Sequence, residues 1–301
     1  MSKRGLVELV TKKYVRGWDD PRLYTLAALR RRGVPPGAIL AFINELGVTT
    51  AKTTTQVARF EQSVRKYLET SVPRAMLVLD PVPLAIDGFE GLAVTEVEVP
   101  FSAKDPTMGT HTLRLTPTVY VDRSDFREVA DEGFFRLAPG RTVGLLGFPA
   151  VHATVTGFTK GTDGRVDGIW AIMDGAGSRR SKAKIHWVPD GSTTVEVRVP
   201  GRLFKSEDPA AAPGGFVEDI NPDSETTHRS ALIEAGFEGI RRSGPWPGEA
   251  GGTEEDQEVV GPENIRFQAM RVGYFAMDKD STSERTVLTR IVSLKSNTGR
   301  D

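Results

Sequence analysis

The hydrophobic pattern changes its period once along the chain, near residue 75. Before that point apolar residues recur at intervals of three or four, as in Val57, Phe60, Val64 and Leu68, a spacing typical of an amphipathic helix. After it apolar and polar residues alternate, as in 94–99, which is typical of half-buried strands. The sequence therefore predicts an α+β protein with a helical N-terminal part and a mainly β remainder.

Helix signals divide the N-terminal part into three segments. The first is expected to start at Asp19 and Asp20, whose carboxylates can accept backbone N–H bonds, and to end at Gly33. The second runs from the two prolines at 35–36 to Gly47. A third begins near 53–55 and stops before the proline at 73. The short connections predict a compact three-helix unit. One face of the second helix is expected to carry Ile39, Leu40, Ile43 and Leu46.

Short strands fill the rest of the chain. Asp-Gly pairs at 163–164 and 190–191 predict hairpin turns. Many short strands of this kind favour antiparallel barrels or sandwiches. The candidate strands are 76–79, 84–86, 94–99, 110–121, 142–146, 151–158, 167–173, 184–188, 194–199, 267–277 and 286–294.

Composition limits the class of protein. At 301 residues the chain is expected to form two or three domains. It has no cysteine, which excludes disulfides, and no apolar run of about 20 residues that could span a bilayer. We therefore expect a cytoplasmic protein without a membrane partner.

Charge and low complexity add two expectations. Residues 1–75 hold 14 Lys/Arg against 6 Asp/Glu, whereas the whole chain has a net charge of −1. This asymmetry indicates either a local contact with a polyanion or a solvated basic helix face. Two stretches rich in Pro, Gly and acidic residues, 206–215 and 244–261, are predicted to be disordered insertions, and the tail 296–301 to fray.

The motifs of common enzymes are missing. The sequence has no P-loop, no glycine-rich dinucleotide fingerprint and no nucleophile elbow. Its four histidines lack metal-ligand spacing, and His186 beside Trp187 is expected to be a packed side chain. No catalytic residue and no metal site can be assigned from these patterns.

Several short segments, taken in order, resemble the glutaminyl-tRNA synthetases. Gly-Trp-Asp-Asp-Pro-Arg at 17–22 and Leu-Arg-Arg-Arg-Gly at 29–33 are similar to the helical region of glutaminyl and eukaryotic-type glutamyl enzymes. Met-Ser-Lys-Arg at 1–4 looks like the class I signature loop. Pro-Arg-Ala-Met at 73–76, with Asp-Pro-Val at 80–82, favours the glutaminyl over the glutamyl branch. Further similar segments lie at 125–128, 185–188, 202–204, 221–222 and 273–275.

The resemblance implies a C-terminal portion of such an enzyme. It predicts a signature-loop remnant and helical tRNA-contacting subdomain at 1–73, followed by two antiparallel β-barrels at 74–301 that bind the anticodon arm and interleave at the C-terminus. The catalytic dinucleotide-fold domain is expected to lie outside this chain. ATP and Mg²⁺ are therefore cofactors of the full-length enzyme only, and this chain alone is expected to be inactive. Lys3, the remnant of the ATP loop, is expected to be a disordered N-terminal lysine.

The same resemblance assigns four anticodon-binding residues. Glutamine anticodons share a central U and a final G, and arginine can bond a base edge or a phosphate. Arg74 and Gln268 correspond to family residues that contact the middle base, Arg136 to one that reads the final G, and Arg271 to one near the final base or its phosphate. The alternative for Arg74 is a cap on the third helix, and for Gln268 and Arg271 an exposed position in a strand.

Three positions depart from the family pattern. A basic residue near Arg136 is replaced by Phe135, and two arginines expected on the next strand are Gly144 and Leu146. The sequence therefore leaves open how the first anticodon base is read.

Two basic clusters are expected to contact the tRNA backbone through sequence-independent phosphate contacts. The alternative for the second cluster, which also includes Lys184, is a solvated turn. The predicted backbone contacts are Lys12, Lys13, Arg16, Arg30, Arg31, Arg32, Arg179, Arg180 and Lys182.

Three functions remain open. The first is binding of tRNA-Gln and recognition of its anticodon by a monomer with no DNA partner, as part of an enzyme that ligates glutamine to tRNA-Gln using ATP. The second is a stand-alone RNA- or protein-binding paralogue without catalysis. The third, an independent β-barrel hydrolase or ligand-binding protein, is disfavoured because no nucleophile–base pair or metal set is visible.

Overall fold

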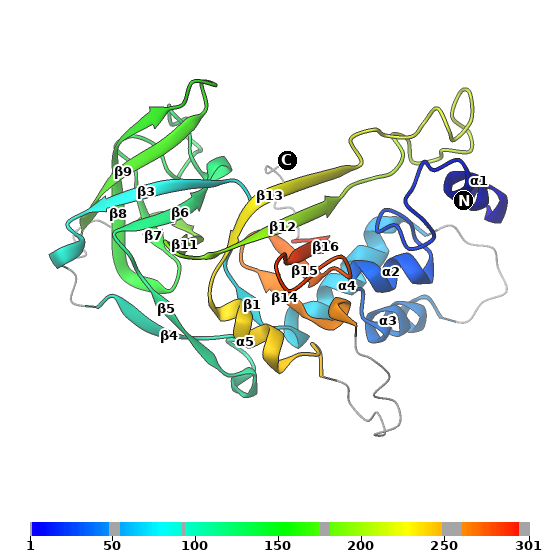
Figure 1. Cartoon of the computed structure of the whole chain (residues 1–301), viewed down its shortest axis with the longest axis horizontal. Helices are drawn as coiled ribbons and strands as arrows, with labels where there is room; N and C mark the ends of the chain where they lie inside the picture. The colour runs from blue at the N-terminus through cyan, green and yellow to red at the C-terminus, as the bar shows by residue number, and fades with distance from the viewer. Residues whose placement is uncertain (1, 48–54, 92–93, 175–180, 249–260, 295–301) are drawn as a thin grey trace.

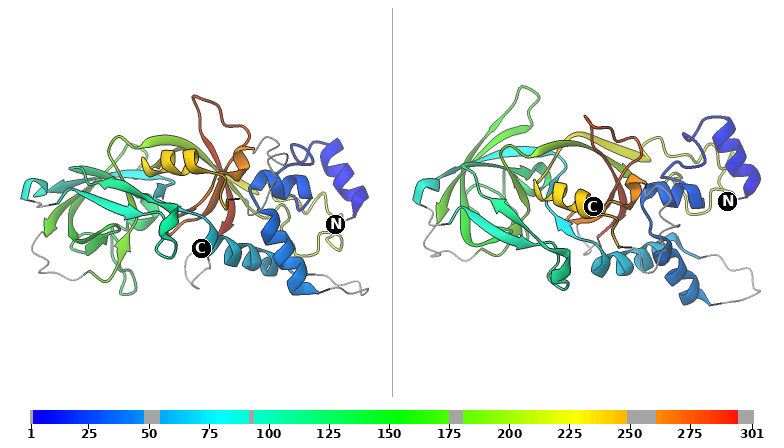
Figure 2. Two further views of the ribbon diagram at one scale, coloured as in Figure 1. Left: turned by 90° about the horizontal axis from the view of Figure 1, so that it is seen from below. Right: turned by 60° about the horizontal axis from the view of Figure 1, so that its bottom comes forward.

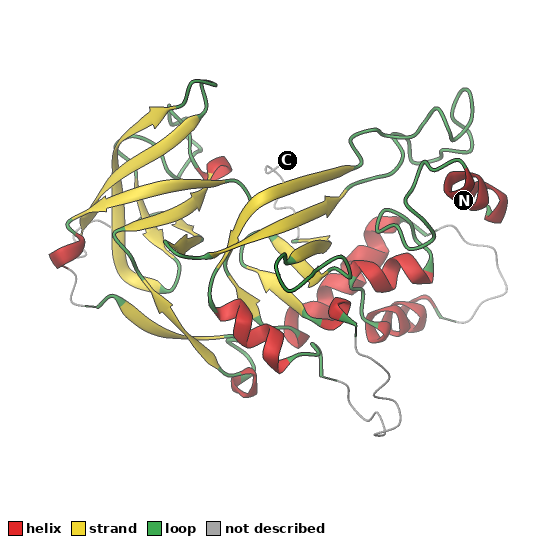
Figure 3. Ribbon diagram, in the orientation of Figure 1, coloured by secondary structure: helices red, strands yellow, loops and turns green. Residues whose placement is uncertain are grey.

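A computed structural model describes residues 2–47, 55–91, 94–174, 181–248 and 261–294. The helices of the N-terminal part lie at one end of an elongated molecule, and two barrel-like sheets follow along its long axis (Figure 1). Helices α1 to α4 all precede the first strand, and most of the remaining elements are strands, so the predicted α+β fold is confirmed (Figure 3). The helical part contains α1 (Lys3–Thr11), α2 (Leu26–Arg32), α3 (Pro36–Leu46) and α4 (Val57–Ser71).

Helix α2 begins later than predicted. The Thr25 hydroxyl caps it by accepting the Ala28 N–H at 3.1 Å. Asp20, the expected start, instead fixes a turn, because its carboxylate accepts the N–H groups of Arg16 (2.9 Å) and Arg22 (3.0 Å). The predicted end is confirmed, since Gly33 adopts a left-handed φ of 90°.

Helix α1 was not predicted, and the expectation of a disordered Lys3 is wrong. Lys3 is the first residue of this helix, which Ser2 caps by accepting the Gly5 N–H at 3.2 Å. The buried side chain of Leu9 packs in a small core with Val15, Leu23, Ala28 and Leu203, and this packing holds α1 on the molecule.

The predicted insertion 206–215 is a series of turns in the structure. Backbone bonds run from Ala211 N–H to the Asp208 carbonyl at 3.1 Å, and from Gly215 N–H to Ala212 at 2.9 Å. Phe204 and Phe216, on either side, pack against the α1 core, so local polarity did not mean disorder. Of the other expected loop, 249–260 lies outside the described residues, as does the tail from 295.

Helices α3 and α4 pack together, but only Ile39 of the predicted face of α3 packs against the core. Leu40 is 61% and Ile43 50% exposed, whereas Ala38 is fully buried. The helices meet at Gly37, where a Cβ atom would lie 2.3 Å from the Tyr67 hydroxyl, and at Phe42, whose ring centre lies 5.1 Å from that of Phe60. A small-residue contact such as Gly37 carries no hydrophobic signal, so the pattern did not predict it.

The barrel next to the helices, called the proximal barrel, has seven strands in the order β1-β14-β15-β16-β12-β13-β2. Its two end strands are consecutive in the chain, so one bent segment closes the sheet. Its core includes Phe267, Phe275 and Leu288. The strands are β1 (Arg74–Ala75), β2 (Leu77–Val78), β12 (Thr193–Pro200), β13 (Glu225–Ile233), β14 (Arg266–Ala269), β15 (Gly273–Met277) and β16 (Val287–Ser293).

The second sheet, the distal barrel, is built in the same way and lies at the end far from the helices (Figure 2). Its order is β10-β7-β8-β9-β3-β6-β11, and the end strands β10 and β11 are again consecutive. All of it lies in the chain between β2 and β12. The strands are β3 (Pro81–Asp87), β6 (Thr118–Asp122), β7 (Thr142–Leu145), β8 (Phe148–Lys160), β9 (Val166–Asp174), β10 (Lys184–Ile185) and β11 (Trp187–Pro189).

Strand pairing is mainly antiparallel, as predicted, but each barrel also has parallel pairs. These are β1–β14, β12–β16, β3–β9 and β7–β10. In each of these four pairs the two strands are not consecutive in the chain. The predicted strand 267–277 is a hairpin that turns at Arg271, whose φ is 66°. The predicted strand 110–121 is likewise two strands, β5 (Thr110–Arg114) and β6.

Smaller elements join the barrels. A hairpin of β4 (Glu96–Pro100) and β5 contributes Leu113 to the distal core, and Phe101, which directly follows β4, belongs to the proximal core. Strand β13 and helix α5 (Gly236–Ser243) were not predicted, and most β13 side chains are at least partly exposed. Short 3-10 turns are Phe89–Gly91, Pro106–Met108, Arg123–Asp125 and Pro262–Asn264. Within the described part of the chain, no helix has the length and apolar character needed to cross a membrane.

Candidate nucleic-acid interface

Arg74 and Gln268 are neighbours across two strands of the proximal barrel. They are register partners in the parallel pair of β1 and β14. Ala75 and Ala269, next in each strand, point into the barrel core, so the two polar side chains share the outer face. Among the described residues, neither side chain has a hydrogen bond or ion pair. The alternative of a helix cap is not seen for Arg74.

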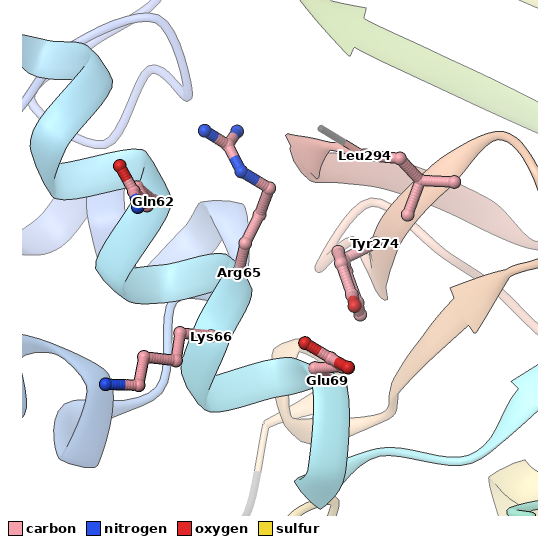
Figure 4. Close-up of a pocket in the computed structure, with 6 residues that line it drawn as sticks. All are labelled: Gln62, Arg65, Lys66, Glu69, Tyr274 and Leu294. Carbon is pink, nitrogen blue, oxygen red and sulfur yellow. The ribbon is translucent and has the colours of Figure 1, made fainter. Parts of the chain in front are cut away.

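A cavity of about 240 Å³ opens on the same outer face (Figure 4). Tyr274, the register partner of Gln268 on β15, forms one wall. Arg65, Lys66 and Glu69 line the α4 side, and Figure 4 shows the Glu69 carboxylate and the Tyr274 hydroxyl directed toward one another. Burial raises the pKa of Tyr274, so its hydroxyl stays protonated at neutral pH.

Asp125 connects the two barrels through arginines. Its carboxylate accepts two bonds from Arg271, at 2.7 and 2.9 Å, and one from Arg136 at 2.7 Å. Arg271 lies in the β14–β15 turn of the proximal barrel, whereas Asp125 belongs to the distal one. The structure therefore brings Arg136 and Arg271 together on one buried carboxylate.

His186 completes this group, which we call the Asp125 cluster (Asp125, Arg136, His186 and Arg271). Arg271 donates to His186 Nδ1 at 3.1 Å, and because arginine can only donate, Nδ1 accepts and the proton is on Nε2. Burial would raise the pKa of Asp125, but the hydrogen bond and charge of Arg271 outweigh it and hold that pKa below its ordinary value. Burial lowers the pKa of His186, so the ring is neutral. The packed role predicted for His186 is confirmed, at 4% exposure.

Phe134 and Phe135 lie beside this cluster but in different surroundings. The Phe134 ring is buried between the guanidinium groups of Arg127 (4.5 Å) and Arg136 (4.8 Å). Phe135 is 41% exposed, and the ammonium of Lys182 lies 5.1 Å from its ring centre. Arg179 and Arg180, the other members of this basic cluster, lie outside the described residues.

Four of the helical cations predicted to contact the tRNA backbone are exposed. Lys12 pairs with Glu8 at 2.7 Å, and Arg30 pairs with Glu263 at 2.8 Å. The Lys12–Glu8 pair is exposed and therefore weak, so Lys12 can exchange its partner. The Arg30 side chain is 73% exposed, but its partner Glu263 is buried. The exposed set is Lys12, Lys13, Arg16 and Arg30.

Arg31 and Arg32 do not lie on that surface, which corrects the prediction for both. Each side chain is only 8% exposed. Arg31 bonds to Asp278 at 3.1 Å and Asp280 at 2.8 Å, and Arg32 donates to the Ile291 carbonyl at 2.7 Å. These contacts dock α2 on the proximal barrel, because a run of three arginines on a helix necessarily points in several directions.

The sequence pattern did not single out Asp125 or His186 as parts of the interface. Both were present only in motifs used for the resemblance. If Arg136 and Arg271 are partly buried, they need a nearby acceptor. This requirement is the signal that could have pointed to Asp125 and His186. Among the described residues, no group of three His, Asp or Glu side chains could hold a metal ion.

Comparison with known protein families gives matches along most of the chain. A family described as tRNA synthetases class I (E and Q), anti-codon binding domain, matches residues 72–174, and a second model of the same description matches 184–244. The model for the catalytic domain of the same class matches residues 1–70.

Curated relatives are similar over the whole chain. A glutamine–tRNA ligase protein virJ of Hypocrea virens is 55% identical over 100% of this chain and 45% of its own length. The glutamine–tRNA ligase of Saccharomyces cerevisiae is 44% identical, again over 100% of this chain and 39% of its own length. That of Bos taurus is 37% identical over 100% and 36%. The chain thus spans less than half the length of these relatives, and it belongs to the class I tRNA synthetases of the Glu and Gln type, comprising their anticodon-binding domains and a short part of the catalytic-domain family.

Proposed function

We propose that this chain binds tRNA-Gln and recognises its anticodon as the C-terminal portion of a glutaminyl-tRNA synthetase. The observation that carries the proposal is the pairing of Arg74 with Gln268. Two polar side chains without a hydrogen bond or ion pair to another described residue lie side by side on an outer face. Arginine offers a planar fork of donors, and glutamine offers donors and an acceptor. Such a pair suits the edge of one unpaired base, and we assign it to the central U.

The Asp125 cluster is assigned to the final base. Arg136 gives one terminal nitrogen to Asp125 and retains other N–H donors for the base. Arg271 turns both terminal nitrogens to Asp125, so in this proposal it positions Arg136 and adds positive charge near the base or its phosphate. Family resemblance and this geometry together support the assignment.

Phosphate contacts are assigned to exposed cations at the helical end and near the distal barrel, namely Lys12, Lys13, Arg16, Arg30 and Lys182. The full-length enzyme would act in the cytoplasm as a monomer and ligate glutamine to tRNA-Gln using ATP and Mg²⁺. The described residues do not fit an ATP site: Lys3 is exposed on α1 and the Ser2 hydroxyl caps that helix. Those sites are assigned to the rest of the full-length protein.

Binding to tRNA-Gln transcripts tests the proposal. The chain should bind the normal transcript more tightly than one with a changed middle base, and Arg74→Ala should remove that preference. We expect a loss of about 1–3 kcal/mol for the normal tRNA, typical of one base-reading arginine. The assay is filter binding at low and at physiological salt.

Arg241→Ala is the matched control, because Arg241 is an exposed arginine on α5 that pairs only with Glu238 at 3.3 Å among the described residues. It should bind both transcripts as the unaltered chain does. Equal binding of the two transcripts by the unaltered chain, lost steeply with salt, would leave only a nonspecific basic surface and contradict the proposal.

A further inference from the structure

An exposed aromatic ring lies next to the arginine assigned to the final base. Phe134, Phe135 and Arg136 follow one another, yet only the middle residue of the three keeps much of its surface in solvent. Phe134 is 5% exposed and sandwiched by two guanidinium groups, whereas Phe135 is 41% exposed. The Phe135 ring is thus accessible beside Arg136.

The Phe135 ring lies beside a lysine whose segment is held to the barrel by a hydrogen bond. Lys182 holds its ammonium 5.1 Å from the centre of the Phe135 ring. The segment that carries Lys182 is fixed to β7, because the Gly144 N–H donates to the Ala183 carbonyl at 2.9 Å. A Cβ at Gly144 would lie 3.0 Å from the Ser181 hydroxyl and 3.3 Å from Cγ of Lys184, so the missing side chain permits this close approach.

An open aromatic ring among cations fits a single-stranded nucleic acid better than a protein partner. A base can stack on the ring, while ammonium groups meet the phosphate that follows it. Stacking of this kind is tolerant of sequence, because every base has a π-face. Among the anticodon positions of tRNA-Gln, the first is the one that is not shared.

We propose that Phe135, with Lys182 over its ring, is a stacking platform for the first anticodon base of the bound tRNA, which it holds without discriminating its identity. This inference rests on the proposed function. It assigns to Phe135 a positioning task that complements base reading by Arg74, Gln268 and Arg136. Positive charge from Lys182 and Lys184, both exposed, then lies beside the backbone of that nucleotide.

The test uses the full 301-residue chain and tRNA-Gln transcripts that differ only at the first anticodon position. Phe135→Ala should weaken binding roughly 5- to 150-fold, the range for loss of one stacked base, and by the same factor for C or U at that position. Phe135→Tyr should restore binding. A transcript without a base at this position should bind the unaltered chain and Phe135→Ala equally.

A spectroscopic readout separates stacking from a structural effect. With 2-aminopurine as the first anticodon base, binding should quench its fluorescence, and Phe135→Ala should remove most of this quenching. Val129→Ala, at a 78% exposed site in the same loop region, is the matched control and should change neither signal. Unchanged affinity and quenching in Phe135→Ala, or an equal loss with the abasic transcript, would overturn the platform.

The two proposals fail differently. If Phe135→Ala has no effect but the unaltered chain still prefers the normal middle base, only the platform is wrong. If the unaltered chain shows no middle-base preference, the proposed function itself fails, whatever Phe135→Ala does. Urea unfolding of each variant is the control for folding. A variant with the same unfolding midpoint as the unaltered chain is folded, so its change in affinity does not come from unfolding.

Discussion

At the scale of single residues, the chain uses arginines for two opposite tasks. Arg74 is left without a carboxylate partner among the described residues, whereas Arg136 and Arg271 share the buried Asp125. The stability of a fold that buries a carboxylate depends strongly on the hydrogen-bond donors of that carboxylate. Removing one member of the ion pair leaves a buried charge uncompensated. The Asp125 cluster therefore links stability to the geometry of the proposed interface.

Asp125→Asn should destabilise the chain by roughly 3–5 kcal/mol at pH 7, as expected for breaking a buried ion pair. The native pKa of Asp125 is lowered, so its contribution is present above the unfolded value of about 3.9 and is lost as pH falls below it. The difference between the two proteins should therefore shrink below about pH 4. Urea unfolding between pH 7 and pH 3 measures it.

The control for this change is Asp131→Asn, which removes a carboxylate that is 72% exposed and pairs with Arg127. It should cost at most about 1 kcal/mol at any pH. A loss for Asp125→Asn that stays constant down to pH 3 would show that its charge is not what stabilises the cluster.

At the scale of elements, neighbouring arginines of helix α2 have different roles: one forms buried ion pairs and one is exposed at the surface. Arg31 contacts Asp19, Asp278 and Asp280, whereas Arg30 is 73% exposed and pairs with Glu263. Asp278 is fully buried and also accepts from the Thr289 hydroxyl, so its charge depends on Arg31 and on Arg198 at 3.8 Å. The docking of α2 is thus ionic as well as apolar.

Arg31→Met should lower the free energy of unfolding by roughly 3–5 kcal/mol, because it leaves Asp278 buried with a single distant cation. Arg59→Met, on α4, removes the cation of an exposed pair in which Glu45 is 52% exposed, and should change it by no more than about 1 kcal/mol. Urea unfolding followed by tryptophan fluorescence compares the two. Equal effects would show that Arg31 does not dock the helix.

At the scale of the whole molecule, the proposed contacts are spread along the long axis. Helix α2 and the segment that follows α1, which carry the exposed cations, lie at the helical end of the molecule (Figure 1). The Asp125 cluster joins the two barrels. An RNA that touches both regions must run from the helical end at least to the junction of the two barrels. The phosphate contacts and the base contacts should then respond differently to salt.

Lys13→Gln should reduce the slope of log affinity against log salt by about one, the value for one lost phosphate contact. Lys13 is exposed and has no ion pair within the described part of the chain, so its loss leaves no unpaired carboxylate. The preference for the normal middle base should be unchanged. A variant that keeps the full salt slope would place Lys13 away from the RNA.

The sequence alone determined the order of helices and strands, because these follow from local periodicity. The helix end at Gly33 and the hairpin glycine at 164, both with positive φ, were predicted for the same local reason. The hairpin predicted at 190–191 is wrong: Gly191 has a positive φ, but this turn joins β11 of the distal barrel to β12 of the proximal barrel. Resemblance of short motifs also predicted the family. Helix α1, strand β13 and the Gly37 contact of α3 were missed, since their stability comes from contacts with distant segments.

Only the tertiary structure decided which cations are available to RNA. Arg30, Arg31 and Arg32 are identical in type and adjacent in sequence, yet one is exposed and two are buried against the proximal barrel. The closure of the proximal barrel by β1 and β2 also places Arg74 beside Gln268. The contact between the two barrels places Arg271 against Asp125. Periodicity is a local property, whereas the partner of a charged side chain depends on residues that lie up to 260 positions away in the chain.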